Sequence, residues 1–182
     1  MRLRGQSLTT LLVGFIALSY LVQLLLPGYE EALWISGFDF QQGEYWRLLT
    51  VALVHGGFFH LGFNLYALHV LGTPVELYFG RNKYILILLT SLIFGSLASA
   101  LFNDPFTASV GASGIVFGLF GALALVGEQV GIEWRGIIGI VLINFALGFV
   151  LGGIDWRAHV GGLLGGTVAS RIMLGLFRNG ID

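Results

Sequence analysis

The stretch GASGIVFGLFGALALV, residues 111–126, decides the fold of this chain. It is apolar throughout and carries no charged side chain. Gly114, Gly118 and Gly121 recur at spacings of four and three residues, so they lie in one strip along a helix. In a membrane, such a strip allows a second helix to approach closely. The stretch therefore predicts a helix of a membrane bundle.

The composition of the whole chain supports this interpretation. Of the 182 residues, 56% are hydrophobic and 10% are charged, whereas a soluble domain usually has about 25% charged residues. The net charge of −1 provides no basic field for nucleic acid. Cysteine is absent, which excludes disulfides, thiolate catalysis and cysteine-based metal sites. We expect no metal or cofactor, and we treat residues 1–182 as a single domain in a lipid bilayer.

Six apolar stretches predict an all-α membrane protein, a bundle of six transmembrane helices. The first is interpreted as a retained helix and not as a signal peptide, because it is too long and lacks a clear cleavage site. The second is expected to end before Pro74. The expected spans are about 7–26, 57–71, 84–102, 112–126, 134–151 and 158–177.

The basic residues predict the orientation. With the N-terminus in the cytoplasm, seven of the nine Lys and Arg residues lie on the cytoplasmic side. Both termini are then cytoplasmic. The connection of residues 28–56 mixes aromatic and charged residues, which suits a segment lying in the outer interface. A small extracytoplasmic subdomain is the alternative. Within this connection, Trp46 and Arg47 are expected to anchor the chain.

Four polar residues lie where a membrane helix would bury them: His60, Asn64, Ser113 and His159. In the predicted topology, all four fall near the outer ends of their spans. Each alone has an ordinary structural explanation, such as a hydroxyl bonded to its own helix or an amide joining two helices. Their coincidence at one depth, on one side, favours a functional site.

The surroundings of Ser113 and His159 suit a close contact between their helices. Ser113 stands where a loop becomes a helix, so free backbone N–H groups point toward an anion placed there. His159 shares a helix face with Gly162 and Gly166. We expect this face to pack on the glycine strip that begins at Gly114.

At this point the chain resembles the rhomboid family over nearly its whole length. The matching motifs are His55-Gly-Gly-Phe-Phe-His60-Leu-Gly-Phe-Asn64, Gly111-Ala112-Ser113-Gly114, Ala158-His159-Val-Gly161-Gly162, Tyr45-Trp46-Arg47 and Val75-Glu76-Leu-Tyr-Phe79-Gly80. Their order and their placement on the expected spans make the resemblance specific. It implies a six-helix rhomboid-type bundle and an intramembrane serine protease.

The resemblance also implies roles for individual residues. Ser113 would be the nucleophile and His159 the general base and then the general acid, with no acidic third member. His60, Asn64 and the backbone N–H of Ser113 would form the oxyanion hole. Asp155 is expected to be a solvated loop charge near Arg157. Supporting positions would be Gly111, Ala112, Gly114, Gly162 and Phe117, where some family members have tyrosine.

The expected function is the cleavage of single-span membrane proteins near the outer membrane surface. A substrate helix must unwind locally, because its carbonyls are otherwise hydrogen-bonded. The sequence does not decide whether the substrate enters between the second and fifth spans or beneath the loop 152–157. It does not decide the oligomeric state either. Alternatives are a rhomboid-like pseudoprotease that binds membrane clients and a small transporter, although a transporter should carry polar groups through the midplane. The short tails favour a prokaryotic cytoplasmic membrane.

Overall fold

The computed structural model describes residues 7–132, 135–136, 138–139, 142 and 154–178. In these ranges the regular secondary structure is helical, and Ile35 and Ser109 form an isolated β-bridge. The long helices are α1 (Leu8–Leu25), α5 (Phe58–Phe79), α6 (Arg81–Phe102), α7 (Ser113–Val126) and α9 (Trp156–Arg178). The short ones are α2 (Tyr29–Leu33), α3 (Gly37–Gln41) and α4 (Arg47–Thr50), with 3-10 turns η1 (Val51–Leu53) and η2 (Glu128–Val130).

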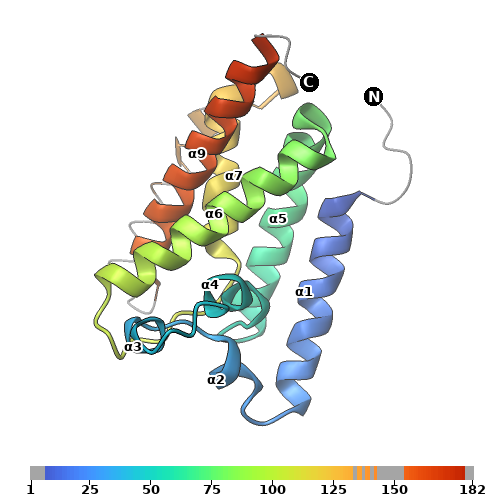
Figure 1. Ribbon diagram of the computed structural model, residues 1–182. Coiled ribbons are helices and arrows are strands. Elements are labelled where there is room, and N and C mark those ends of the chain that lie inside the picture. Colours follow the sequence, from blue (N-terminus) through green and yellow to red (C-terminus); the bar gives the residue numbers. More distant parts are fainter. Residues whose placement is uncertain (1–6, 133–134, 137, 140–141, 143–153, 179–182) are drawn as a thin grey trace.

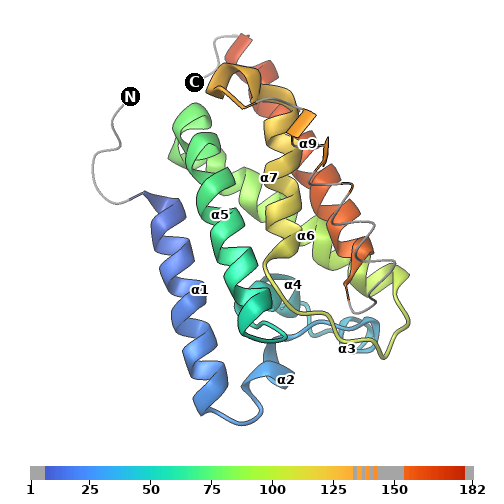
Figure 2. The ribbon, with the colours of Figure 1, turned by 180° about the vertical axis from the view of Figure 1, so that it is seen from behind.

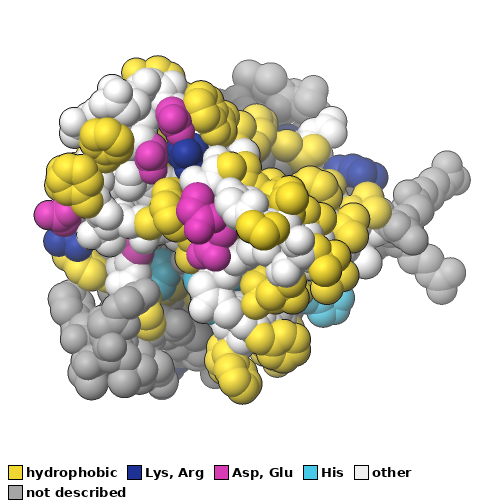
Figure 3. Space-filling view, turned by 90° about the horizontal axis from the view of Figure 1, so that it is seen from below, with side chains coloured by type: hydrophobic (Ala, Val, Ile, Leu, Met, Phe, Trp, Pro, Cys, Tyr) yellow, Lys and Arg dark blue, Asp and Glu magenta, His cyan; other side chains and the backbone are white. Residues whose placement is uncertain are grey.

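Three helices form the centre of the bundle. Helices α6, α7 and α9 pack on one another, α5 packs on α7, and α1 packs on α5 at the edge (Figures 1 and 2). Helices α5, α7 and α9 all begin at the lower end of Figure 1, where α2, α3 and α4 also lie. Seen from below, this end carries several separate groups of acidic side chains, and histidine is visible near the central one (Figure 3). His60, Ser113 and His159 belong to the first turns of α5, α7 and α9, so these three residues lie toward the same end of the bundle.

Helices lie at most of the expected spans. Helices α1, α6, α7 and α9 match their predicted ranges to within a few residues, whereas the expected span 134–151 lies mostly outside the described residues. Among the described residues, α1 and α6 are each long and apolar enough to cross a membrane. The segments Arg47–Leu53 and Phe58–Phe79, bent by 102° to each other, could form a third span. The count of six spans stays a prediction.

The predicted end of the second span is wrong. Helix α5 continues through Pro74 to Phe79 and ends at Gly80, whose φ of +76° suits glycine. Proline removes one backbone N–H, which a well-packed membrane helix can tolerate. Beyond Pro74, Val75, Glu76 and Phe79 are buried, and Glu76 accepts hydrogen bonds from Leu8 N at 2.7 Å and Thr9 N at 2.9 Å. Glu76 therefore joins the end of α5 to the start of α1.

Helix α9 meets α7 through glycine, as the sequence predicts. A Cβ atom added to Gly162 would lie 2.1 Å from the carbonyl oxygen of Gly114. One added to Gly166 would lie 2.2 Å from that of Gly118. Both distances are far below a van der Waals contact, so the two backbones touch directly at the end where Ser113 and His159 lie.

A second glycine face on α9 was not predicted. A Cβ on Gly161 would lie 2.4 Å from the carbonyl oxygen of Phe94, and one on Gly165 would lie 2.7 Å from that of Thr90. Both partners belong to α6. Helix α9 is thus held in close contact on two sides, and its axial position is fixed by two helices.

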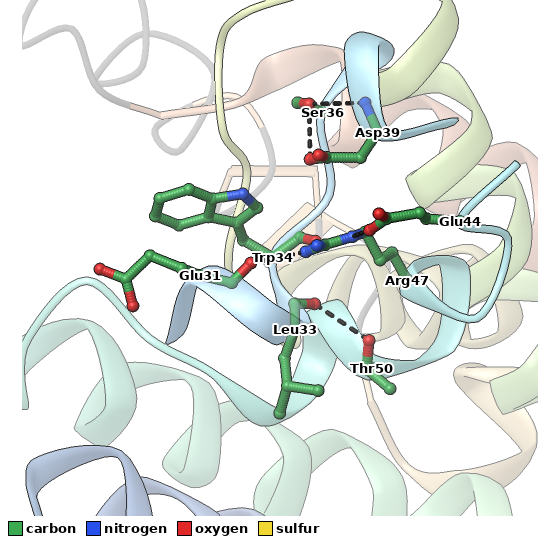
Figure 4. A network of polar contacts seen from close by, with 8 residues as sticks. All are labelled: Glu31, Leu33, Trp34, Ser36, Asp39, Glu44, Arg47 and Thr50. Carbon is green, nitrogen blue, oxygen red and sulfur yellow. Dashed lines mark hydrogen bonds and ion pairs between the residues drawn. The ribbon is translucent and has the colours of Figure 1, made fainter. Parts of the chain in front are cut away.

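The connection before α5 is organised around Arg47. Its side chain, 8% exposed, donates hydrogen bonds to the carbonyl oxygens of Glu31 at 2.7 Å and Trp34 at 2.8 Å, and it pairs with Glu44 (Figure 4). Thr50 adds a hydrogen bond to the segment through its hydroxyl. Arg47 therefore anchors this connection, as expected.

Candidate active site

Ser113 is the first residue of α7, and the loop before it is tightly held. Gly111 has a φ of +115°, which side chains other than hydrogen rarely allow. Its N–H donates to the carbonyl of Val51 at 2.9 Å. Helix α7 has no side-chain cap among the described residues, so the N–H groups of its first turn are directed at the lower end of the bundle. This is an arrangement that can bind an oxyanion.

His159 lies in the first turn of α9 and is 5% exposed. Its ring stacks on Phe117, with centroids 4.0 Å apart and an interplanar angle of 12°. Phe117 stands one helical turn after Ser113 on α7. This contact places the imidazole beside α7, at a position one helical turn beyond Ser113. The direct contact of Gly114 with Gly162 supports the same placement from the backbone side.

His60 and Asn64 occupy the first two turns of α5. The ring of His60 lies against the loop that enters α7, since a Cβ on Gly111 would be 2.7 Å from its Cε1 and 2.9 Å from its Nε2. Asn64 is 6% exposed, and its Nδ2 donates to the carbonyl of His60 at 2.9 Å. His60 is therefore beside the entry to Ser113, whereas the described hydrogen bond of Asn64 stays within its own helix.

His55 supports the same loop, in a part of the chain outside the expected spans. It is fully buried, and its Nε2 accepts the backbone N–H of Ala112 at 3.4 Å. Burial first, and the neighbouring charge of His60 second, lower the pKa of His55 to about 3. The ring is therefore neutral near pH 7 and can accept this hydrogen bond. His55 fixes the residue directly before Ser113.

Gln23 is a contributor that the sequence reasoning missed. Its side chain accepts from His55 N at 3.0 Å and donates to His55 O at 2.9 Å. An amide in the otherwise apolar stretch of α1 was the available signal. It ties the end of α1 to the loop beneath the site.

The expectation for Asp155 is wrong, because this carboxylate is not a solvated loop charge. It is partly buried directly before α9. Burial raises its pKa, but hydrogen bonds outweigh that effect, so the pKa lies below its ordinary value. The donors are the side chains of Ser99, Ser109 and Asn103 and the backbone N–H groups of Arg157 and Ala158. This cluster could not be recognised in the sequence, because its members are up to 56 residues apart.

A comparison with models of protein families shows to which family the chain belongs. The family model of the Rhomboid domain matches residues 42–176. The chain belongs to the rhomboid family. The match includes His60, Asn64, Ser113 and His159. With its apolar helices, this rhomboid chain is an integral membrane protein.

Individual proteins that are similar to this chain also carry rhomboid names. The rhomboid chain is 45% identical over 134 residues to Rhomboid protease GluP of Bacillus subtilis (strain 168), covering 71% of this chain and 26% of that one. It is 33% identical over 156 residues to Putative rhomboid protease YdcA of the same organism, covering 80% and 78%. It is 38% identical over 141 residues to RHOMBOID-like protein 4 of Arabidopsis thaliana, covering 72% and 34%. The chain thus spans only about a quarter of GluP and a third of RHOMBOID-like protein 4.

The assembled groups suit acyl transfer. A hydroxyl at an uncapped helix start and an imidazole stacked on the same helix, one turn further along, are the parts of an activated nucleophile. Among the described residues, no group of three or more His, Asp or Glu side chains is placed to hold a metal ion.

Proposed function

We propose that this chain is a serine endopeptidase that cleaves membrane proteins in or beside their transmembrane segments, with Ser113 as nucleophile and His159 as general base. The observation that carries the proposal is the stack of His159 on Phe117, one turn after Ser113. The backbone contact of Gly114 with Gly162 supports it, because it brings the first turns of α7 and α9 together.

The reaction proceeds in two steps. Ser113 Oγ attacks the carbonyl carbon of the scissile bond while His159 takes the hydroxyl proton, and His159 then gives that proton to the departing amine. Water attacks the resulting ester with His159 again as base. The acid is released, and the proton returns to Ser113 Oγ.

The oxyanion formed in each step needs hydrogen-bond donors. The N–H groups at the uncapped start of α7 and the ring of His60 beside Gly111 are the best-placed candidates. The second amide hydrogen of Asn64, the one not bonded to His60, adds a third donor. One such donor typically stabilises the transition state by about 2.7–4 kcal/mol.

The substrates are single-span membrane proteins, and the site opens to the extracytoplasmic side. The basic residues support this orientation, since Arg81 and Lys83 at the start of α6 and Arg178 at the end of α9 lie, among the described residues, at the opposite end from Ser113. The acidic residues in the connection before α5 agree with it.

Cleavage of a single-span reporter in liposomes tests the proposal. The wild type should cleave it, and Ser113→Ala and His159→Ala should not. The matched controls are Ser170→Ala, at a fully buried serine further along α9, and His69→Ala, at an exposed histidine on α5, and both should cleave normally. Equal cleavage by the wild type and both dyad variants would refute the dyad. A wild type that binds the reporter without cutting it would indicate a client-binding pseudoprotease.

A further inference from the structure

The carboxylate of Asp155 connects the two segments that carry Ser113 and His159. Its Oδ1 accepts hydrogen bonds from the backbone N–H groups of Arg157 and Ala158, both at 3.1 Å. These N–H groups belong to the first turn of α9, so Asp155 caps the start of the helix that carries His159.

The second oxygen of Asp155 faces away from α9. Oδ2 accepts hydrogen bonds from Ser99 Oγ at 2.5 Å and Asn103 Nδ2 at 2.8 Å, both at the end of α6. It also accepts one from Ser109 Oγ, four residues before Ser113. One carboxylate thus bonds to the start of α9, the end of α6 and the segment leading into α7.

The partners of Asp155 are themselves fixed. Arg157 Nη1 donates to Asn103 Oδ1 at 2.8 Å, which turns the amide so that Nδ2 faces the carboxylate. Ser109 is paired through its backbone with Ile35, at 2.8 and 3.1 Å. Asp155 is therefore held against a rigid frame and not against a free loop.

We infer that Asp155 is a positioning residue, which holds the first turn of α9 against α6 and residues 109–113 and so fixes the His159 imidazole relative to Ser113 Oγ. This inference rests on the proposed function. Asp155 acts through the backbone of α9 and touches no reacting atom. Its effect falls on the chemical step, because a misplacement of about 1 Å can cost about 100-fold in rate.

Five variants test this role by kcat and KM on the liposome reporter. Asp155→Ala removes both sets of hydrogen bonds, whereas Asp155→Ser keeps a good helix cap and removes only the Oδ2 contacts. In both, kcat should fall about 10- to 100-fold with KM nearly unchanged. Ser109→Ala removes a single donor and leaves the backbone pairing intact, so it should fold and lose kcat more mildly. Asp155→Asn combined with Asn103→Asp exchanges carboxylate and amide across their contact, and it should recover kcat relative to Asp155→Asn alone.

A control separates positioning from general stability. Glu76→Ala also removes a buried carboxylate that holds the start of a helix, but at the other end of the bundle. It should lower the melting temperature and leave kcat unchanged below that temperature.

Three results would each overturn the positioning role. The first is a wild-type kcat in both Asp155→Ser and Ser109→Ala, and the second is an equal kcat in Asp155→Asn and in the Asp155→Asn/Asn103→Asp pair. The third is a loss of kcat in Glu76→Ala as large as the loss in Asp155→Ala. Ser113→Ala is measured alongside. Unchanged cleavage in Ser113→Ala would refute the proposed function itself. If cleavage instead depends on Ser113 and Asp155→Ser retains the wild-type kcat, only the role of Asp155 is refuted.

Discussion

The sharpest structural prediction concerns Gly162, where α9 touches α7. In Gly162→Ala the new Cβ would lie 2.1 Å from the carbonyl oxygen of Gly114, 2.7 Å from its carbonyl carbon and 2.9 Å from its Cα. All three atoms belong to the backbone, so no side-chain rotation can relieve the overlap. The first turns of α7 and α9 must separate.

The magnitude follows from these distances. Uncharged heavy atoms rest about 3.5 Å apart, so relief of the 2.1 Å contact requires the helices to separate by about 1.4 Å. Overpacking of this kind costs about 1–3 kcal/mol of stability. A shift of about 1 Å between nucleophile and base costs about 100-fold in rate. We therefore expect a modest loss of stability and a large loss of kcat.

The assay compares Gly162→Ala with Gly175→Ala on the same helix. An added Cβ at Gly175 would meet nothing within 4 Å, and alanine in a helix is more stable than glycine by about 0.5–1 kcal/mol. Gly175→Ala should thus keep or raise the melting temperature and keep kcat. Wild-type cleavage by folded Gly162→Ala would refute the link between the glycine contact and catalysis.

Three further predictions follow from the described contacts. Phe117→Ala removes the ring stacked on His159 and should lower kcat about tenfold in the reporter assay, whereas Phe117→Tyr keeps the ring and should stay near wild type. Arg47→Ala removes the hydrogen bonds of a buried guanidinium to two partly buried carbonyl groups and should destabilise the protein by about 1–3 kcal/mol in thermal unfolding; an unchanged melting temperature would contradict the anchoring role. The folded-state pKa of Asp155 lies below its ordinary value of 3.8, so its stabilisation is present above that value and is lost as the pH falls through the folded pKa. Melting temperatures at decreasing pH should therefore show wild type losing its advantage over Asp155→Asn below about pH 4, and a constant difference would contradict this.

The parts of the structure that depend on local pattern could be predicted from the sequence. Apolar runs located α1, α6, α7 and α9, and the spacing of glycines identified the contact between α7 and α9. The site residues could be grouped because topology alone puts the starts of α5, α7 and α9 at one end.

Features that depend on tertiary contact could not be predicted. Proline ordinarily ends a helix, and the buried contacts of Val75, Glu76 and Phe79 that accompany the continuation of α5 form only in the folded chain. Asp155 looked like a loop charge because its donors come from distant segments that meet only in the folded chain. Gln23 was overlooked for the same reason, since its partner His55 lies 32 residues away.

The most direct test of the central claim is covalent labelling of the wild type by a fluorophosphonate, followed by mass spectrometry of the modified peptide. Such a reagent reacts with a serine hydroxyl that a neighbouring base has activated. We predict an adduct on Ser113 in the wild type and none on that residue in His159→Ala. An adduct on a different serine, or equal labelling of Ser113 without the imidazole, would contradict the account.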